Sequence, residues 1–461
     1  MPSLNDAYST YPAMATIMGD TALLRHMARF EGALAHAQAE AGLVPAEAAT
    51  VIAEIAASLP FDEPSLFADA VKAGTLAIPF VKSLTAAVRT HTPSAAPFMH
   101  FGATSQDVID SALVLQLGEA LVLIDADLTR LAGAAAGLAR LHRNSAMLGR
   151  TLLQPATPTT FGLKAAQWLS AAMQSRTRVR AIAREALVAQ FGGAAGTLGS
   201  LGAHGAATAA ILQRRLADAN AYPPARDATV HGTPIPWHTR RGALISLASE
   251  LAIATGIAGK IARDISLMMQ YEVAETFEPS EAGRGGSSAM PHKRNPVRCM
   301  LTVSAALRTP GLVATLLTGM VQEHERALGG WQAEWGALPE LVKLTAGALA
   351  NMADTLDGLQ VDVARMRANF EALKGLPMTE MLSLALAPGL GRAEAFALVE
   401  AAAKEVAASG RSLGEIVKAN TSATAHLSPA QIDAILDPLS ALGATQAFID
   451  TALDGWAKLE A

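Results

Sequence analysis

Residues 244–268 read LISLASELAIATGIAGKIARDISLM, and they are the clearest evidence in this chain for its fold class. Apolar residues recur every three or four positions, the repeat of a helix that packs in a bundle. They are Leu244, Leu247, Leu251, Ala254, Ala258, Ile261, Ile265 and Met268. Ile253 and Ile257 form a second apolar face, so the helix is expected to be buried on most sides. We predict a central strut of a helical bundle that continues into other subunits.

The rest of the chain also favours helices. Alanine and leucine dominate, aromatic residues make up only 5%, and strands with alternating polar and apolar residues are hard to find. Further long helices are expected at 107–142 and 297–325, the second with a kink at Pro310. We therefore predict an all-α protein of three helical domains. These are an N-terminal domain at 1–106, a central long-helix bundle at 107–364 and a C-terminal domain at 365–461.

Charge and composition exclude several classes of partner. The 461 residues include 36 Lys and Arg against 41 Asp and Glu, so the basic surface of a nucleic-acid-binding protein is missing. Charged residues interrupt every long apolar stretch, which argues against a membrane span. The first residues, MPSLNDAYST, lack the pattern of a secretory signal. Because Cys299 is the single cysteine, no intramolecular disulfide can form, and we expect a cytoplasmic protein.

Templates for metal and nucleotide binding are also missing. The sequence contains no HExxH, no CxxC and no GxxxxGK[ST] motif, and the glycine-rich segment 192–202 does not follow a strand as a dinucleotide-binding loop does. The sequence therefore predicts an enzyme that uses neither a metal nor a cofactor.

One loop carries the residue types that such an enzyme needs. Residues 283–296 read GRGGSSAMPHKRNP. The glycines of this loop leave its backbone free to adopt many conformations, Ser287 and Ser288 supply hydroxyls, and Lys293 and Asn295 supply hydrogen-bond donors. Removing a proton from the carbon next to a carboxylate creates a dianion, which donors and positive charge stabilise in a water-poor site. A serine exchanges that proton only if the same field lowers its pKa. The alternative is a basic surface loop between two helices.

The motifs resemble those of the fumarase/aspartase superfamily. GSSAMPHKRNP at 286–296 is similar to the superfamily's GSSxMPxKxNP loop. HFGATSQDVID at 100–110, GRTLLQPATPTTFG at 149–162 and GGAAGT at 192–197 resemble its other motifs, in the same order, so the resemblance covers essentially the whole chain. It implies three helical domains and a homotetramer whose long helices form a twenty-helix core. It also implies active sites shared between three subunits and a small polycarboxylate substrate.

Within the superfamily, MPHKRNP favours the branch of adenylosuccinate lyases and muconate cycloisomerases. GGAAGTLGSLG at 192–202, PIPWHTRR at 234–241 and QEHERALGGWQAEW at 322–335 look like the cycloisomerases. Leu152 stands where lyases of amines have a histidine after GRT. An amine leaving group must be protonated, whereas a carboxylate leaving group needs no acid. Leu152 therefore favours the intramolecular addition of a carboxylate across a double bond, unless another acid such as His100 replaces the histidine.

The resemblance also assigns roles to individual residues. It makes Ser287 the proton donor, with His100 and Lys293 as the other catalytic residues. The expected substrate-binding residues are Thr104, Ser105, Gln154, Thr157, His238, Arg241, Ser288, Asn295 and Arg326. Two alternatives stay open at this point: His100 only binds substrate, and Arg326 belongs to a surface salt-bridge face.

Three other functions also stay open. The first is a C–N lyase of the adenylosuccinate lyase type. The second is a cycloisomerase specialised for a sulfonate in place of a carboxylate. The third is a structural relative without activity, against which the retention of Ser287, Lys293 and Asn295 argues.

Overall fold

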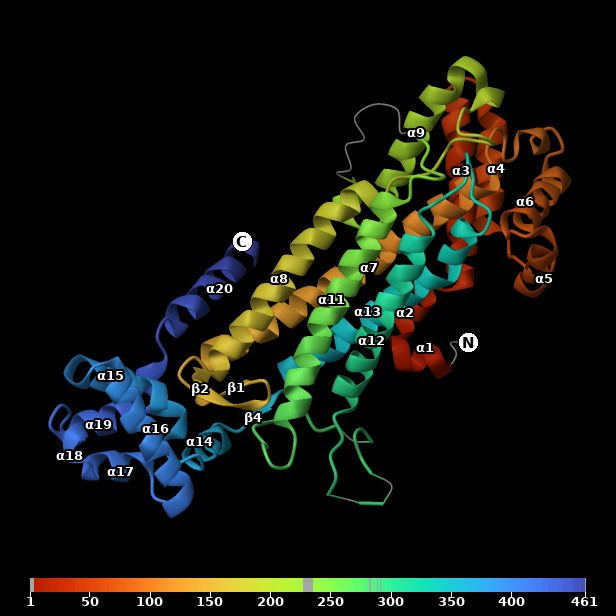
Figure 1. Ribbon diagram of the computed structural model, residues 1–461. Coiled ribbons are helices and arrows are strands. Elements are labelled where there is room, and N and C mark those ends of the chain that lie inside the picture. The colour runs from red at the N-terminus through yellow and green to blue at the C-terminus, as the bar shows by residue number, and fades with distance from the viewer. Residues whose placement is uncertain (1–3, 227–234, 282, 288, 291, 461) are drawn as a thin grey trace. The chain divides into compact units, whose positions relative to one another are not determined.

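The computed structural model describes residues 4–226, 235–281, 283–287, 289–290 and 292–460 (Figure 1). The chain divides into two compact units. Unit 1 comprises Met1–Leu128, Gln174–Gly259 and Leu301–Ala350, and unit 2 comprises Thr129–Met173, Lys260–Met300 and Asn351–Ala461. The three domains expected from the sequence, with boundaries at 106/107 and 364/365, stay a prediction.

Five long helices contribute residues to both units. They are α7 (Ser105–Leu141), α8 (Phe161–Ala186), α11 (Gly242–Met268), α12 (Val297–Thr318) and α13 (Gly330–Asp357). The predicted helices at 107–142 and 244–268 correspond to α7 and α11. The third predicted helix is shorter, because α12 ends at Thr318 instead of continuing to 325. The chain leaves it at Gly319, where a Cβ would lie 3.1 Å from the carbonyl oxygen of Gly330 at the start of α13.

Buried polar contacts join the long helices within unit 1. Thr255 on α11 donates a hydrogen bond to Thr345 on α13 over 2.9 Å, and Ser175 on α8 donates to Glu250 on α11 over 3.0 Å. All four side chains are buried. A buried hydroxyl or carboxylate without a partner costs free energy, so these pairs favour one alignment of the helices. The predicted long-helix bundle is confirmed.

The shorter helices of unit 1 precede or follow the bundle. They are α1 (Leu4–Ser9), α2 (Pro12–Ile17), α3 (Asp20–Glu40), α4 (Ala46–Ser58), α5 (Glu63–Ala73), α6 (Ala77–His91), α9 (Gly205–Asp218) and α10 (Pro223–Arg226), with the 3-10 turns η1 (Ala96–Phe98) and η2 (Gly199–His204). The buried helix α3 packs against α4 and α9. A Cβ on Gly32 of α3 would lie 3.2 Å from the Cα of Ala53 on α4, so a glycine permits this close approach.

Unit 2 contains the C-terminal helices and two small sheets. The helices are α14 (Val363–Glu371), α15 (Thr379–Leu390), α16 (Arg392–Ser409), α17 (Leu413–Ala419), α18 (Thr421–Thr424), α19 (Pro429–Leu436) and α20 (Thr445–Glu460), with η3 (Leu376–Met378) and η4 (Pro438–Ala441). One antiparallel sheet joins β1 (Ala146–Thr151) to β2 (Gln154–Thr160), and the other joins β3 (Thr276–Phe277) to β4 (Gln360–Val361). The all-α prediction therefore holds for the architecture, with two short additions.

Two of the long helices, α11 and α12, are apolar and long enough to cross a membrane by length and composition. In α11 this apolar window is 56% buried, as in a core helix of a globular protein, whereas in α12 it is 22% buried. Two such helices are weak evidence for a membrane protein. The exposed apolar face of α12 includes Leu307 and Leu317.

Candidate active site

In unit 1, the segment 100–104 forms a tight turn that leads into α7. His100 has a φ of 54° and Gly102 a φ of 72°, both in the left-handed region. The backbone N–H of Thr104 donates to Oδ2 of Asp107 over 3.0 Å, which caps the start of the helix. The side chains of Thr104 and Ser105 are half-buried. No described residue hydrogen-bonds to either hydroxyl, so both are free to contact a substrate oxygen.

Asp107 joins three of the predicted motifs into one cluster. Its buried carboxylate accepts the backbone N–H groups of Gly192 and Gly193 over 3.0 and 2.9 Å. It also lies 2.7 Å from Nε2 of His238. A carboxylate that accepts several donors holds their segments in register. The structure therefore brings together the turn before α7, the glycine-rich loop at 192–197 and the segment of His238.

Close backbone contact explains why this cluster needs glycines. A Cβ on Gly193 would lie 2.8 Å from the carbonyl oxygen of Gly102. A Cβ on Gly102 would lie 2.7 Å from a methyl carbon of Leu201. Both glycines also have positive φ values, which side chains disfavour. The two turns therefore pack directly against each other. The resulting cluster has backbone groups and hydroxyls that are available to a ligand.

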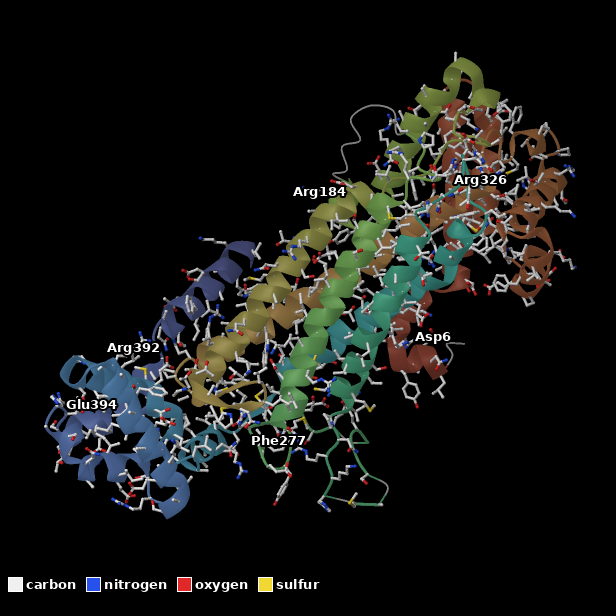
Figure 2. The ribbon with its side chains drawn as sticks, viewed as in Figure 1. Asp6, Arg184, Phe277, Arg326, Arg392 and Glu394 are labelled. Atoms are coloured by element: carbon white, nitrogen blue, oxygen red, sulfur yellow. The ribbon has the colours of Figure 1, made fainter. Side chains whose placement is uncertain are left out.

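Arg326 belongs to the same part of unit 1 (Figure 2). Its guanidinium donates to the carbonyl oxygen of Ala194 in the glycine-rich loop over 3.2 Å. Its Nε is buried and has no hydrogen-bond partner among the described residues. Arg326 therefore keeps donors available beside the loop, and no described carboxylate forms an ion pair with it. This geometry favours an anion-binding role over the alternative of a surface salt bridge.

His100 lies at the start of this cluster and is paired with a carboxylate that sequence reasoning missed. Its Nδ1 is 2.6 Å from Oε1 of Glu31 on α3. Burial by itself would lower the pKa of His100, but the charge and hydrogen bond of Glu31 and the charge of Asp107 outweigh it. The net effect raises the pKa of His100 above its ordinary value.

Arg241 is held in a different way from Arg326. Its guanidinium donates to Asp110 over 2.7 Å and to Glu334 over 3.0 Å, and it lies 4.6 Å from the ring centre of Trp237. Asp110 also accepts the indole N–H of Trp331 over 3.0 Å. All three charged groups are buried. This geometry favours an anchoring role, and the predicted contact of Arg241 with substrate stays a prediction.

In unit 2, the GRT motif at 149–151 lies on the β1–β2 hairpin. Arg150 donates twice to the buried carboxylate of Glu275, over 2.9 and 2.7 Å. Glu275 also accepts from Asn369 on α14 over 2.9 Å. These contacts fasten the hairpin close to its tip, since Arg150 pairs with Pro155 next to the last pair, Thr151 and Gln154. Gln154 and Thr157 are exposed on strand β2.

The tip of this hairpin has an unusual conformation. Leu152 and Leu153 connect the paired residues Thr151 and Gln154, with φ values of 50° and 64°. Two-residue turns of this kind normally contain Asn and Gly, because a left-handed backbone strains other side chains. Both leucines are exposed, to 96% and 76%. The hairpin therefore presents a strained apolar tip.

The GSSAMPHKRNP loop, also in unit 2, contains the predicted proton donor. Oγ of Ser287 accepts the backbone N–H groups of Met290 and Ala289 over 3.2 and 3.4 Å. Asn295 closes the loop, since its side chain donates to the carbonyl oxygen of Gly286 over 3.3 Å. Lys293 is exposed. Ser288, predicted to bind substrate, lies outside the described residues.

The predicted residues therefore form two groups. Unit 1 clusters His100, Thr104, Ser105, His238, Arg241 and Arg326, and unit 2 carries Gln154, Thr157, Ser287, Lys293 and Asn295. Their union into one site stays a prediction. Sequence reasoning missed the carboxylates Glu31, Glu275 and Glu334, for which no local pattern exists. No group of three metal-ligating side chains occurs among the described residues.

The long-helix bundle with these loops defines a helical lyase. A family model described as lyase matches residues 4–311, and one described as the adenylosuccinate lyase C-terminus matches residues 375–452. The chain therefore belongs to the lyase family, within the superfamily that its motifs resemble.

Cycloisomerases and a nitrosuccinate lyase are among the proteins similar to this chain. The 3-carboxy-cis,cis-muconate cycloisomerase of Bradyrhizobium diazoefficiens is 47% identical over 442 residues, 96% of this chain and 95% of that protein. The crystal structure of the 3-carboxy-cis,cis-muconate lactonizing enzyme from Pseudomonas putida matches with a TM-score of 0.91 and 41% identity, covering 100% of both chains. A nitrosuccinate lyase of Streptomyces davaonensis is 42% identical over 438 residues, 95% of this chain and 91% of that protein.

Proposed function

We propose that this protein converts 3-carboxy-cis,cis-muconate to 4-carboxymuconolactone, a step of aromatic catabolism through protocatechuate. The observation that carries the proposal is the apolar hairpin tip at Leu152 and Leu153. A titratable acid is missing at this position, which suits a leaving group that departs as a stable anion. The similarity to cycloisomerases over nearly the whole chain supports the same substrate.

In the proposed mechanism, the substrate's own carboxylate closes the ring. Negative charge then develops on the carboxylate that activates the double bond, in the form of an aci-carboxylate. Lys293, Asn295 and Arg326 stabilise that charge, and the free hydroxyls of Thr104 and Ser105 donate to substrate oxygens. Ser287 delivers the proton to carbon. His100 binds a carboxylate or acts as an acid, while Gln154, Thr157, His238 and Ser288 complete the binding residues.

We further propose a homotetramer with active sites shared between subunits. The exposed apolar face of α12 supports it, because contiguous exposed apolar surface commonly marks a surface that another chain covers. The compartment we propose is the cytoplasm, in keeping with the bacterial metabolic enzymes among the relatives.

A second candidate is the elimination of nitrite from nitrosuccinate. The similarity to a nitrosuccinate lyase favours it, and so does the chemistry at Leu152. Nitrite, like a carboxylate, leaves as a stable anion and needs no acid. The hairpin tip therefore argues against an amine leaving group unless His100 supplies the acid, and it does not separate the carboxylate reaction from the nitrite reaction.

An ultraviolet assay of the purified protein tests the proposal. We expect rapid loss of carboxymuconate absorbance, with a kcat/KM well above that for nitrosuccinate, 3-sulfomuconate or adenylosuccinate. The reaction should persist after treatment with a chelator. A higher kcat/KM for one of the other compounds would reassign the substrate. Binding of carboxymuconate without turnover of any compound would identify an inactive relative.

The hairpin tip yields a separate prediction. Replacing Leu152 with Asn and Leu153 with Gly should raise the free energy of unfolding by about 1 kcal/mol, because these residues tolerate the left-handed turn. We also propose that the tip faces the substrate, so loss of its apolar surface should lower kcat/KM for the muconate about tenfold. Urea unfolding and the ultraviolet assay measure the two effects. A more stable variant with unchanged turnover would show that the tip does not face the substrate.

A further inference from the structure

Helix α3 holds the turn at 100–101 through two side chains on the same face of the helix. Glu31 binds the imidazole of His100, and Gln38, seven residues further along, donates to the backbone carbonyl of Phe101. Seven residues are two helical turns, so the two side chains point in the same direction. The first contact reaches the ring of a candidate catalytic residue, whereas the second reaches only the backbone beside it.

The Glu31 carboxylate lies in a setting that favours a cationic partner. Its side chain is 1% exposed, and His100 supplies the only ion pair found for it among the described residues. A buried carboxylate loses its hydration, and a positively charged hydrogen-bond donor compensates best for that loss. The two atoms are 2.6 Å apart, which is short for a nitrogen–oxygen hydrogen bond. Charge-assisted hydrogen bonds are shorter than neutral ones, so the distance is in the direction expected for a charged pair.

The contact with Glu31 also decides which way the imidazole faces. Because Glu31 occupies Nδ1, Nε2 is the nitrogen that remains available to a ligand. The His100 side chain keeps 17% of its surface exposed, in a turn where its own backbone has a positive φ. A non-glycine residue in this region is strained, and such strain persists where tertiary contacts hold it in place. Glu31 provides one of those contacts.

From this geometry we propose that Glu31 is a positioning residue that keeps His100 as an imidazolium ion with Nε2 directed toward the substrate. His100 then contributes a positive charge and a donor for a substrate carboxylate. The charged groups that act on the ring are Glu31 from α3 and Asp107 from α7, both negative. The Asp107 carboxylate already has four hydrogen-bond partners, namely Thr104, Gly192, Gly193 and His238. Glu31 is therefore the carboxylate that hydrogen-bonds directly to His100. The catalytic consequence rests on the proposed function, whereas the state of His100 does not.

The pH dependence follows from the sign of the shift. Because the pair raises the pKa of His100, the imidazolium persists above its ordinary titration range and is lost as the pH rises further. In the Glu31→Gln variant the ring should titrate at lower pH, by about 1–3 pH units. In this variant, kcat/KM should begin to fall at a lower pH than in wild type, and the two midpoints should differ by the same interval. Lowering the pH should then restore binding, so the defect lies mainly in KM.

Hydrogen–deuterium exchange at the imidazole C2 position, followed by mass spectrometry, gives the titration midpoint of His100 in the intact protein without substrate. Wild type, Glu31→Gln, Glu31→Asp and Gln38→Met are compared. Gln38→Met is the matched control, because it removes a hydrogen bond from the same helix to the same turn and leaves the carboxylate. We expect a lowered midpoint in Glu31→Gln, partial recovery in Glu31→Asp and an unchanged midpoint in Gln38→Met.

Two results would overturn the inference. One is a His100 midpoint that does not move in Glu31→Gln. The other is an equal shift in Gln38→Met, which would mean that the ring responds to loosening of the turn and not to charge. If the wild-type protein turns over no muconate, the midpoints still decide the state of His100, so failure of the proposed function is recognised separately.

Discussion

Replacing Ser287 with alanine should lower kcat for carboxymuconate by about 10²–10⁴-fold, the range for losing a positioned proton donor. Ser287 Oγ already accepts two backbone N–H groups, from Ala289 and Met290. Such donors stabilise the negative charge that remains on the oxygen after it gives up its proton. Alanine keeps the backbone of the loop and removes only the atom that carries the proton. Rapid-mixing measurements of carboxymuconate loss give kcat directly.

The matched control for this change is Ser280→Ala. Ser280 is an exposed serine of the same unit, and its hydroxyl accepts a hydrogen bond from Arg294 over 2.9 Å. Turnover in this control should stay within about twofold of wild type, as for surface substitutions away from a site. Circular dichroism and light scattering should show both variants folded and assembled as wild type. Near wild-type turnover in Ser287→Ala would remove Ser287 from the role of acid.

Replacing Arg241 with methionine should reduce the free energy of unfolding by about 3–5 kcal/mol, the range for breaking a buried ion pair on one side. The change leaves Asp110 and Glu334 facing each other, both buried and without their shared cation. Burial raises the pKa of Glu334, and Arg241 holds it down. Without Arg241, that pKa should rise further, and Glu334 should take up a proton on folding.

The sign of the pH effect follows from that proton. A carboxyl group with a raised pKa in the folded state binds more protons there than in the unfolded chain, so stability falls as the pH increases. The deficit of the variant should therefore be smaller at about pH 5 than at about pH 8. Urea unfolding of wild type and variant at each pH, at one protein concentration, measures this deficit.

Arg240→Met provides the comparison. Arg240 is the exposed neighbour of Arg241, and the acceptors of its guanidinium among the described residues are the backbone carbonyls of Ile235 and Pro236. We expect the free energy of unfolding of this variant to differ from wild type by at most about 0.5 kcal/mol. If Arg241→Met matched Arg240→Met in stability and instead raised KM, the anchoring role of Arg241 would be wrong and its predicted contact with substrate would gain support.

Local sequence patterns were sufficient to predict much of the fold of this protein. The apolar repeat at 244–268 predicted α11 to within two residues, because a helix has a period that its own sequence records. The helices α8 and α13 were not among the elements predicted. The β1–β2 hairpin was missed because its turn contains Leu152 and Leu153 where turn-forming residues are expected.

What the sequence by itself determined is the class: an all-helical bundle, glycine-rich turns, and a serine and cations in one loop. Those features depend on neighbours within a few positions. Only the tertiary structure decided which charges meet. Glu31 and His100 are 69 positions apart, and Asp110 and Arg241 are 131 apart. An isolated acidic residue looks the same on a helix surface and in a buried pair, because its environment is made by segments that approach only when the chain folds.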